Sequence, residues 1–257
     1  MHITFLGSGS AFTVDNYQSN MLLTGESGKR MLFDCGGDIR WALREKELTA
    51  LDIDAVYISH LHADHVGGLE YVAFTNYFVK TVKTGFKPVL YGNSKLLHDL
   101  WHHSLKGGLD SIQMMDSTLD TFFDVVKLPN SGSFDFDGIH CKTVQTVHVV
   151  ADTTFVKSFG LMITTEHGAK VFITSDTQFA PAQLKDFIAD ADVVFHDCET
   201  APFASGVHAH YEDLKGLPKE QKAKMYLYHW NGDAEGLPNA KQDGFADFVA
   251  KGQVFAF

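Results

Sequence analysis

The most informative segment of the chain is His60-Leu61-His62-Ala63-Asp64-His65, which holds three imidazoles and one carboxylate within six residues. Given the histidine and aspartate content of the chain, this order is expected by chance only roughly 0.004 times. Protonated imidazoles this close would repel one another, whereas neutral imidazole is a good ligand for Zn²⁺ and related cations. The segment therefore predicts a metal site, and a solvated polar turn is the alternative.

Ligand-type side chains also follow three other strand-like segments. His148 comes directly after residues 143–147, Asp176 after 171–175 and His229 after 225–228, while His60 itself follows the apolar stretch 53–59. Loops at strand ends are where a rigid scaffold commonly presents functional groups, and a solvated turn at residues 60–65 would not explain this recurrence. Four strand ends are thus expected to converge on seven donors. The candidate metal ligands are His60, His62, Asp64, His65, His148, Asp176 and His229.

Two assignments keep an alternative. His148 directly follows an alternating strand as the other ligands do, whereas His140, eight residues earlier, precedes that strand, so His148 is preferred. Asp34 ends an early strand and has two interpretations, a turn cap or a carboxylate that holds a ligand imidazole from behind. Gly7 and Gly9 also follow a strand, but Phe12 stands where a dinucleotide fingerprint needs its third glycine, so a tight turn is predicted there.

The elements that must position these residues are strands and helices mixed from end to end. Early strands follow one another as hairpins, which favours a layered α+β sandwich over a doubly wound parallel sheet. No linker divides the chain, so one domain over residues 1–257 is predicted, with a helical insertion at about 71–123 as a candidate lid or dimer surface. Strands are expected at 2–6, 21–24, 31–33, 53–59, 89–91, 141–147, 159–165, 171–175, 193–195, 224–228 and 254–257, and helices at 38–46, 69–79, 95–105, 181–189 and 245–250.

Composition limits the partners. With 32 acidic and 21 basic residues the formal charge is −11, which disfavours long nucleic acids and anionic membrane surfaces. The three cysteines are widely spaced, unlike a disulfide framework, and indicate a reducing compartment. Neither a signal-peptide pattern nor an apolar run long enough to span a bilayer is evident. A cytoplasmic protein is therefore expected.

The order of these donors resembles the metallo-β-lactamase superfamily, whose pattern is His-x-His-x-Asp-His followed by a His, a bridging Asp and a last His. The resemblance is also supported by the sequence of the segments 6–10, 32–36, 175–177 and 228–230. The resemblance covers the whole chain and implies an α+β fold, the four-layer αβ/βα sandwich. It also implies two divalent transition-metal ions, zinc first and manganese or iron as alternatives. By this resemblance one ion takes His60, His62 and His148, the other takes Asp64, His65 and His229, and Asp176 bridges them.

Residues 195–200 and 207–214 look like the region that supplies a non-ligand histidine near the leaving group in phosphodiesterase members, including the tRNA 3′-processing and cyclic-phosphate branches. His208 is the best match, and His210 and His196 are the alternatives. Glu199 would orient that imidazole, and Asp64 is expected to take part in catalysis through the metal. The predicted catalytic set is Asp64, His208 and Glu199.

Several branches of this superfamily share this set of metal ligands, and the sequence argues against three of them. A redox di-iron branch usually has Glu at the place of His62, and the antibiotic-hydrolysing branches lack the bridging Asp and are secreted. The tRNA-processing branch grips RNA with a basic arm, whereas the insertion here carries four acidic residues. They are Asp110, Asp116, Asp120 and Asp124.

A hydrolase of a small molecule remains. The favoured function is a phosphodiesterase acting on a small, cyclic nucleotide or similar phosphodiester through a hydroxide held between two metals. A lactone or thioester hydrolase, which would more often use a tyrosine to polarise the carbonyl, is the alternative. A non-catalytic metal-binding module is disfavoured because structural sites are normally closed and mononuclear. The expected partner is a small-molecule substrate, with a homodimer as an assembly that the resemblance allows.

Overall fold

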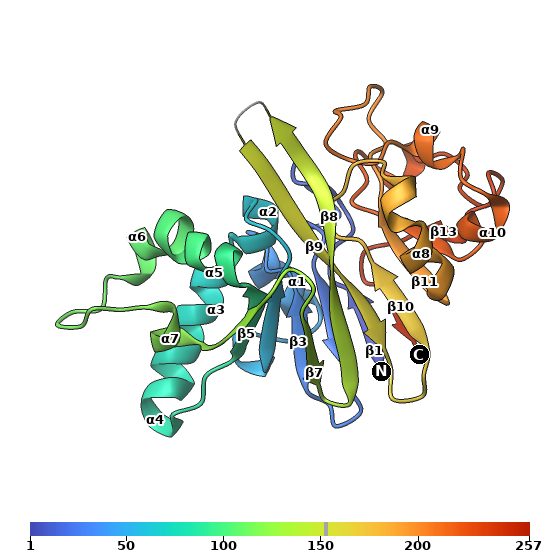
Figure 1. The fold of residues 1–257 in the computed structure, drawn as a ribbon. Coiled ribbons are helices and arrows are strands. Elements are labelled where there is room, and N and C mark those ends of the chain that lie inside the picture. The colour runs from blue at the N-terminus through green and yellow to red at the C-terminus, as the bar shows by residue number, and fades with distance from the viewer. Residues whose placement is uncertain (152–153) are drawn as a thin grey trace.

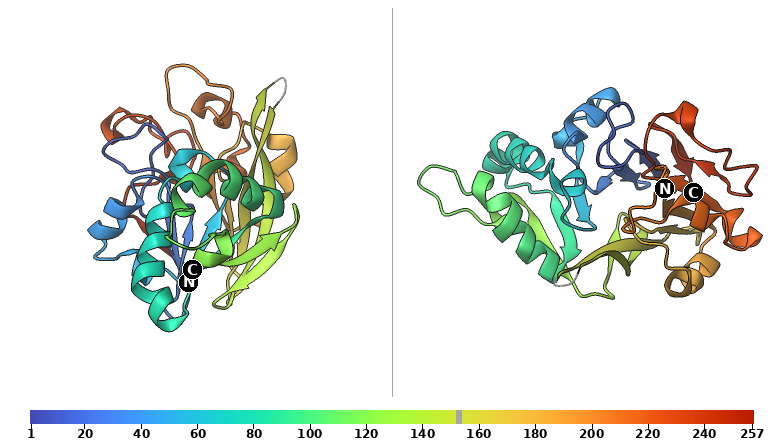
Figure 2. Two further views of the ribbon diagram at one scale, coloured as in Figure 1. Left: turned by 90° about the vertical axis from the view of Figure 1, so that its left-hand side faces the viewer. Right: turned by 90° about the horizontal axis from the view of Figure 1, so that it is seen from above.

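The computed structural model describes residues 1–151 and 154–257, which form two seven-stranded sheets packed face to face (Figure 1). In the first sheet the strand order is β14-β1-β2-β3-β4-β5-β6, and in the second it is β13-β12-β11-β10-β9-β8-β7. Helices cover the outer side of each sheet (Figures 1 and 2). The predicted α+β four-layer sandwich is therefore confirmed.

The first sheet changes direction in the middle. Strands β14, β1, β2 and β3 are antiparallel neighbours, whereas β3, β4, β5 and β6 run parallel. Parallel neighbours need a crossover connection, and the chain makes these crossovers through its helices. The strands are β1 His2–Phe5, β2 Met21–Thr24, β3 Arg30–Phe33, β4 Ala55–Ile58, β5 Val89–Asn93, β6 Asp124–Leu128 and β14 Val254–Ala256.

The second sheet has the same mixed character. Strands β7 to β10 are antiparallel in sequence order, and β10, β11, β12 and β13 are parallel. The parallel strands end at one common edge, which the site uses. The strands are β7 Ser133–Phe136, β8 Ile139–Ala151, β9 Thr154–Thr164, β10 Lys170–Ile173, β11 Val193–Asp197, β12 Met225–Tyr228 and β13 Asp247–Phe248.

Most helices are short, and two π-helical segments continue α3 and α5. The longest helix, α8, begins with a proline, which suits the first helical position, and buries Leu184 and Ile188 at i, i+4 spacing. The helices are α1 Ile39–Glu45, α2 Ala63–Val66, α3 Leu69–Asn76, α4 Val82–Thr84, α5 Ser94–Leu100, α6 Lys106–Leu109, α7 Leu119–Phe122, α8 Pro181–Asp190, α9 Tyr211–Leu214 and α10 Lys219–Lys222, with π-helical segments Tyr77–Thr81 and Trp101–Leu105 and 3₁₀ turns Ala50–Asp52 and Ala234–Gly236.

Apolar packing between the sheets fixes the two halves of the molecule relative to one another. Phe5 on β1 and Phe195 on β11 are fully buried, with ring centroids 4.9 Å apart. Tyr57 on β4 likewise stacks on Phe134 of β7 at 5.9 Å. Burial of each such side chain is worth about 1.5–3 kcal/mol. Because this core spans both sheets, side chains from the two sheets can be held in a fixed mutual geometry.

The sequence-based elements differ from the structure in three places. The helix expected at 245–250 is wrong: Ala246 N and Val249 N donate to Met225 O and Leu227 O of β12, and the segment forms β13. Its apolar spacing also suits a helix, but an unpaired sheet edge offers these backbone groups partners. Strands β6 and β7 were not expected. The strand expected at 89–91 is confirmed as β5, which interrupts the helical segment 71–123 and lies inside the first sheet between β4 and β6.

Within residues 1–151 and 154–257, no helix combines the length and apolar character that crossing a bilayer requires.

Candidate metal centre

The seven predicted metal ligands come together in one place. Their donor atoms form two overlapping groups, and within each group all donor atoms lie within 4.8 Å of one another. One group contains His60, His62, His148 and Asp176, and the other contains Asp64, His65, Asp176 and His229. The grouping matches the division expected from the sequence, with Asp176 in both. Asp176 and His229 also lie in a third group of possible donors, together with Asp197 and His208.

Three residues at the site have the unusual backbone conformation with a positive φ. Asp34, Ser175 and His229 each have a positive φ, at 65°, 54° and 66°, and each lies within two residues of the end of a strand. Such a conformation costs on the order of 1–3 kcal/mol in a non-glycine residue, and it persists where the surrounding structure imposes it. Here it turns the chain sharply at the strand end, so that His229 and the residue after Ser175 face the site.

A β-bulge directs the side chain of His148 toward the other donors. Strand β8 does not stop before His148, as the sequence suggested, but continues to Ala151. The register shifts between Val147 and Val149, which pair with the consecutive residues Lys157 and Val156 of β9. His148 is therefore the extra residue of a bulge, a feature that commonly re-aims a side chain near a functional site.

The His60–His65 segment needs glycine neighbours. Helix α2 makes a single turn that presents Asp64 and His65, and it packs against the loop after β3. A Cβ atom at Gly36 would lie 2.2 Å from the backbone oxygen of Asp64, and one at Gly68 would lie 2.4 Å from that of Gly36. Only glycine permits this close approach, which brings the ligand helix against the first sheet.

In the first donor group, three imidazole nitrogens face each other. His148 Nδ1 donates to the backbone oxygen of Val207 at 2.8 Å, which leaves a lone pair on its Nε2. This Nε2 lies 3.0 Å from His62 Nδ1, and His60 Nε2 lies 3.1 Å from the same atom. Asp176 Oδ2 is 3.7 Å from both Nε2 atoms. A cation bound between these nitrogens would remove the repulsion between their lone pairs.

The second group has the same spacing. Asp64 Oδ2 lies 3.2 Å from His65 Nε2 and 3.3 Å from His229 Nε2, and Asp176 Oδ2 lies 3.3 and 3.5 Å from these nitrogens. Tetrahedral ligands about 2.0–2.1 Å from an ion are about 3.3 Å apart. Among the described residues, His65 Nε2 and Asp176 Oδ1 are also buried without a hydrogen-bond partner. The donor set therefore fits a divalent cation in each group.

Asp34 supports this arrangement from behind. Its Oδ2 accepts hydrogen bonds from His65 Nδ1 at 2.8 Å and from Ser59 Oγ at 2.7 Å, and its Oδ1 accepts from Ser59 N at 2.8 Å. The bond to Nδ1 directs the lone pair of Nε2 into the site. These contacts match the interpretation of Asp34 as a carboxylate that holds a ligand imidazole.

In the first donor group, electrostatics favour the protonation states that metal ligands require. Burial lowers the pKa of His60 well below its usual range and also lowers the pKa values of His62 and His148, which keeps these imidazoles neutral. Although burial opposes ionisation of Asp176, the histidines around it, His229 first, hold its pKa well below the usual range. Neutral imidazole and ionised carboxylate are the forms that coordinate metals.

His208 stands beside the donors and forms a pair with Asp197. Its Nδ1 donates to Asp197 Oδ2 at 2.8 Å, and Nδ1 lies 3.9 Å from Asp176 Oδ2. Burial opposes protonation, yet the carboxylate of Asp197 raises the pKa of His208 to about 10. Asp197 thus stabilises the charged form of the ring and engages Nδ1 rather than Nε2.

Asp197 is the functional residue that sequence reasoning missed. It is the last residue of β11, is fully buried, and accepts a further hydrogen bond from Thr177 N at 2.8 Å. Its Oδ1 lies 3.5 Å from Nδ1 of His229. The signal was present, because Asp197 ends a strand as several of the predicted ligands do, but the expected strand stopped two residues earlier, at Phe195.

The other candidates have different contacts. Glu199 Oε2 accepts a hydrogen bond from Ser205 N at 2.8 Å. The carboxylate that accepts a hydrogen bond from His208 belongs to Asp197, not to Glu199 as predicted. His210 Nε2 donates to the backbone oxygen of Ala201, and its Nδ1 accepts from Glu212 N at the start of α9. His196 donates to the oxygen of Asp197, and the exposed His140 pairs with Asp135 on β7.

Comparison with solved structures supports the fold assignment. A diphosphatase of the PhnP family superimposes with a TM-score of 0.76 at 19% identity, covering 100% of this chain and 97% of that one. Human tRNase Z, short form, gives 0.71 at 22% identity, covering 100% and 99%. The metallo-β-lactamase fold protein YhfI from Bacillus subtilis gives 0.74 at 18%, covering 99% and 98%. These likenesses show that the chain has the metallo-β-lactamase fold.

Comparison of sequences defines the family. A family model described as Anti-Pycsar protein Apyc1 matches residues 1–255. The protein of that name from Paenibacillus harenae is 35% identical over 233 residues, covering 90% of each chain. Its counterpart from Bacillus phage vB_BveM-Goe7 is 33% identical over 238 residues, covering 91% of this chain and 90% of that protein. The chain therefore belongs to the anti-Pycsar protein Apyc1 family.

Proposed function

We propose that this protein is a metal-dependent phosphodiesterase that opens the phosphodiester of a small cyclic nucleotide. The observation that carries the proposal is the His208–Asp197 pair, which places a protonated, non-ligand imidazole beside the two donor groups. Solved relatives of this fold include a diphosphatase and a tRNA-processing nuclease, both of which act at phosphorus. The donors of each group are spaced to hold one ion.

The proposed metal content is two divalent ions, with zinc preferred and manganese or iron also suited to histidine and carboxylate donors. When bound, these ions would activate a water molecule and neutralise charge that develops on the phosphoryl oxygens. His60, His62 and His148 would hold one ion, and Asp64, His65 and His229 the other. Asp176 would bridge them.

The chain's own residues complete the reaction. Opening a cyclic phosphodiester releases a sugar alkoxide, a poor leaving group that gains from proton donation. His208 would give the proton from Nε2, because Nδ1 is engaged by Asp197. Asp197 would fix the ring orientation and stabilise its charged form. Asp176 and Asp64 would remain ionised throughout, since neighbouring imidazoles hold their pKa values low in spite of burial.

Charge supports a small substrate. The formal charge of −11 opposes a long polyanion, and the segment between α6 and α7 adds acidic rather than basic side chains. A lactone or thioester hydrolase would more often use a tyrosine to polarise the carbonyl, whereas a non-ligand imidazole suits protonation of an alkoxide that leaves phosphorus. The His208–Asp197 pair therefore favours phosphodiester over acyl chemistry.

The test is turnover by the purified, metal-loaded protein. We expect conversion of a 3′,5′-cyclic nucleotide to a nucleoside monophosphate, resolved by chromatography, and loss of that activity in Asp176→Ala. A homoserine lactone and a thioester serve as competing substrates in the same assay. Hydrolysis of either one, with no turnover of cyclic nucleotides or of bis-nitrophenyl phosphate, would overturn the proposal.

A further inference from the structure

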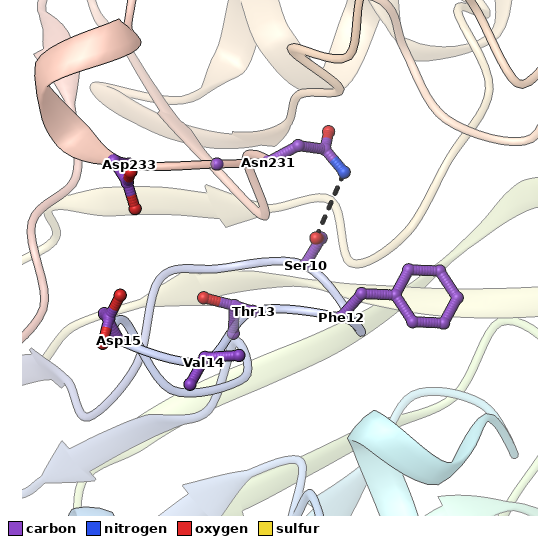
Figure 3. Close-up of a pocket in the computed structure, with 8 residues that line it drawn as sticks. Ser10, Phe12, Thr13, Val14, Asp15, Asn231 and Asp233 are labelled. Carbon is purple, nitrogen blue, oxygen red and sulfur yellow. Dashed lines mark hydrogen bonds between the residues drawn. The ribbon is translucent and has the colours of Figure 1, made fainter.

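Asn231, two residues after the candidate ligand His229, is joined to two other loops by four hydrogen bonds. Its Oδ1 accepts from Thr200 N at 3.1 Å, and its backbone oxygen accepts from Thr200 Oγ1 at 3.0 Å. Its own N donates to the same hydroxyl at 2.9 Å. Its Nδ2 donates to Ser10 Oγ at 3.2 Å, the dashed line in Figure 3. One asparagine thus connects three segments that are distant in sequence.

The loop that begins at Thr200 carries His208. Its base is closed by the pairing of Glu199 with His210, where Glu199 N donates to Ala209 O and Tyr211 N donates to Glu199 O. Between these anchors, residues 202–206 are exposed. Few apolar contacts are available to hold such a stretch, so its position depends on hydrogen bonds. They include the bonds of Asn231 at Thr200, the bond from Ser205 N to Glu199 Oε2 and the bond from His148 Nδ1 to Val207 O.

The strand end that carries His229 is joined to the loop after β1. His229 N donates to Ser8 O, and Ser10 N donates to Trp230 O. Beside the Ser10–Asn231 bond lies a cavity of about 260 Å³, lined by residues 10, 12–15 and 231–233 (Figure 3). The side-chain bond of Asn231 adds to these backbone bonds and links the two loops at the edge of this cavity.

We propose that Asn231 is a positioning residue that sets the location of His208 relative to the candidate metal ligands. The inference rests on the proposed function, in which His208 donates a proton to the leaving oxygen. Asn231 does not touch the reacting atoms and acts through Thr200 and the loop that follows. A displacement of about 1 Å of a catalytic group can cost on the order of 10²-fold in rate.

The kinetic test compares Asn231→Ala with two other variants. We expect Asn231→Ala to lower kcat about 10- to 100-fold on a cyclic nucleotide and far less on bis-nitrophenyl phosphate, whose leaving group needs no proton. Metal content should not change. Asn231→Asp, which keeps the acceptor for Thr200 N, should restore most of the rate. Asn16→Ala is the matched control, because Asn16 Nδ2 donates to Gly232 O across the same loops without contacting Thr200.

A double-mutant cycle tests the route of the effect. If Asn231 acts through His208, Asn231→Ala should cause no further loss in a His208→Ala background, because residues that act as one unit are not additive. Equal losses on the two substrates, a further loss in that background, or a loss no larger than that of Asn16→Ala would each overturn the inference.

Amide hydrogen exchange gives a readout that does not depend on activity. The Thr200 amide donates to Asn231 Oδ1, so Asn231→Ala should speed its exchange about 5- to 10-fold, together with that of the following loop. Unchanged exchange would overturn the inference. If the wild-type protein fails to turn over cyclic nucleotides, the proposed function fails, and the exchange result still decides whether Asn231 holds this loop.

Discussion

Replacement of His208 by alanine should separate phosphodiester chemistry from its alternatives. His208 is not among the seven predicted metal ligands, although it shares a third group of possible donors with Asp176, Asp197 and His229, and its side chain is 18% exposed. The variant therefore removes the proposed proton donor and leaves all seven predicted ligands in place. We expect metal content and circular dichroism to match those of the wild-type protein.

The size of the loss follows from the pairing with Asp197. A pKa raised to about 10 keeps nearly every His208 ring protonated at neutral pH. Loss of a positioned general acid typically costs 10²- to 10⁴-fold, or about 3–5 kcal/mol of transition-state stabilisation. We expect this full loss in kcat for a cyclic nucleotide, whose leaving group is an alkoxide. Nitrophenolate departs without help, so the loss on bis-nitrophenyl phosphate should be less than about 10-fold.

The assay measures kcat on both substrates with the same enzyme preparations. His140→Ala is the control, since this exposed histidine pairs with Asp135 on β7 and makes no contact with the donors. Equal losses on both substrates would assign His208 to substrate binding or metal support. No loss on either would refute the acid role and make a lactone or thioester the better substrate class.

Three further predictions concern the metal centre. Elemental analysis should find about two transition-metal ions per protomer, because the donors form two groups around one shared carboxylate; a stoichiometry of zero under metal-replete conditions would contradict the site. Asp64→Ala and Asp176→Ala should each abolish hydrolysis while circular dichroism keeps the wild-type spectrum, and near wild-type activity in either would exclude the proposed mechanism. Asp34→Ala should weaken metal binding about 10- to 100-fold, since Asp34 orients His65, and a chelator competition that shows unchanged affinity would return Asp34 to the role of a turn cap.

The sequence alone determined the fold class and which seven donor residues meet at one place. Ligand-type residues after alternating or apolar strands are a local signal, because the strand period and the strand end can both be read from a few neighbouring residues. His60, Asp176 and His229 were found in this way. The resemblance of their order to one superfamily then supplied the layered sandwich, and each strand expected from the sequence is present in the structure.

Tertiary structure decided what depends on partners distant in sequence. Strand β13 forms because the edge of β12 supplies backbone partners that no local pattern shows. His148 faces the site through a bulge that only its register with β9 reveals. Asp197 rather than Glu199 holds His208, and Asn231 joins three loops, because hydrogen-bond partners are chosen by where the loops meet. Periodicity specifies which face a residue occupies within its own element, whereas the pairing of side chains across loops is fixed only when both sheets have packed.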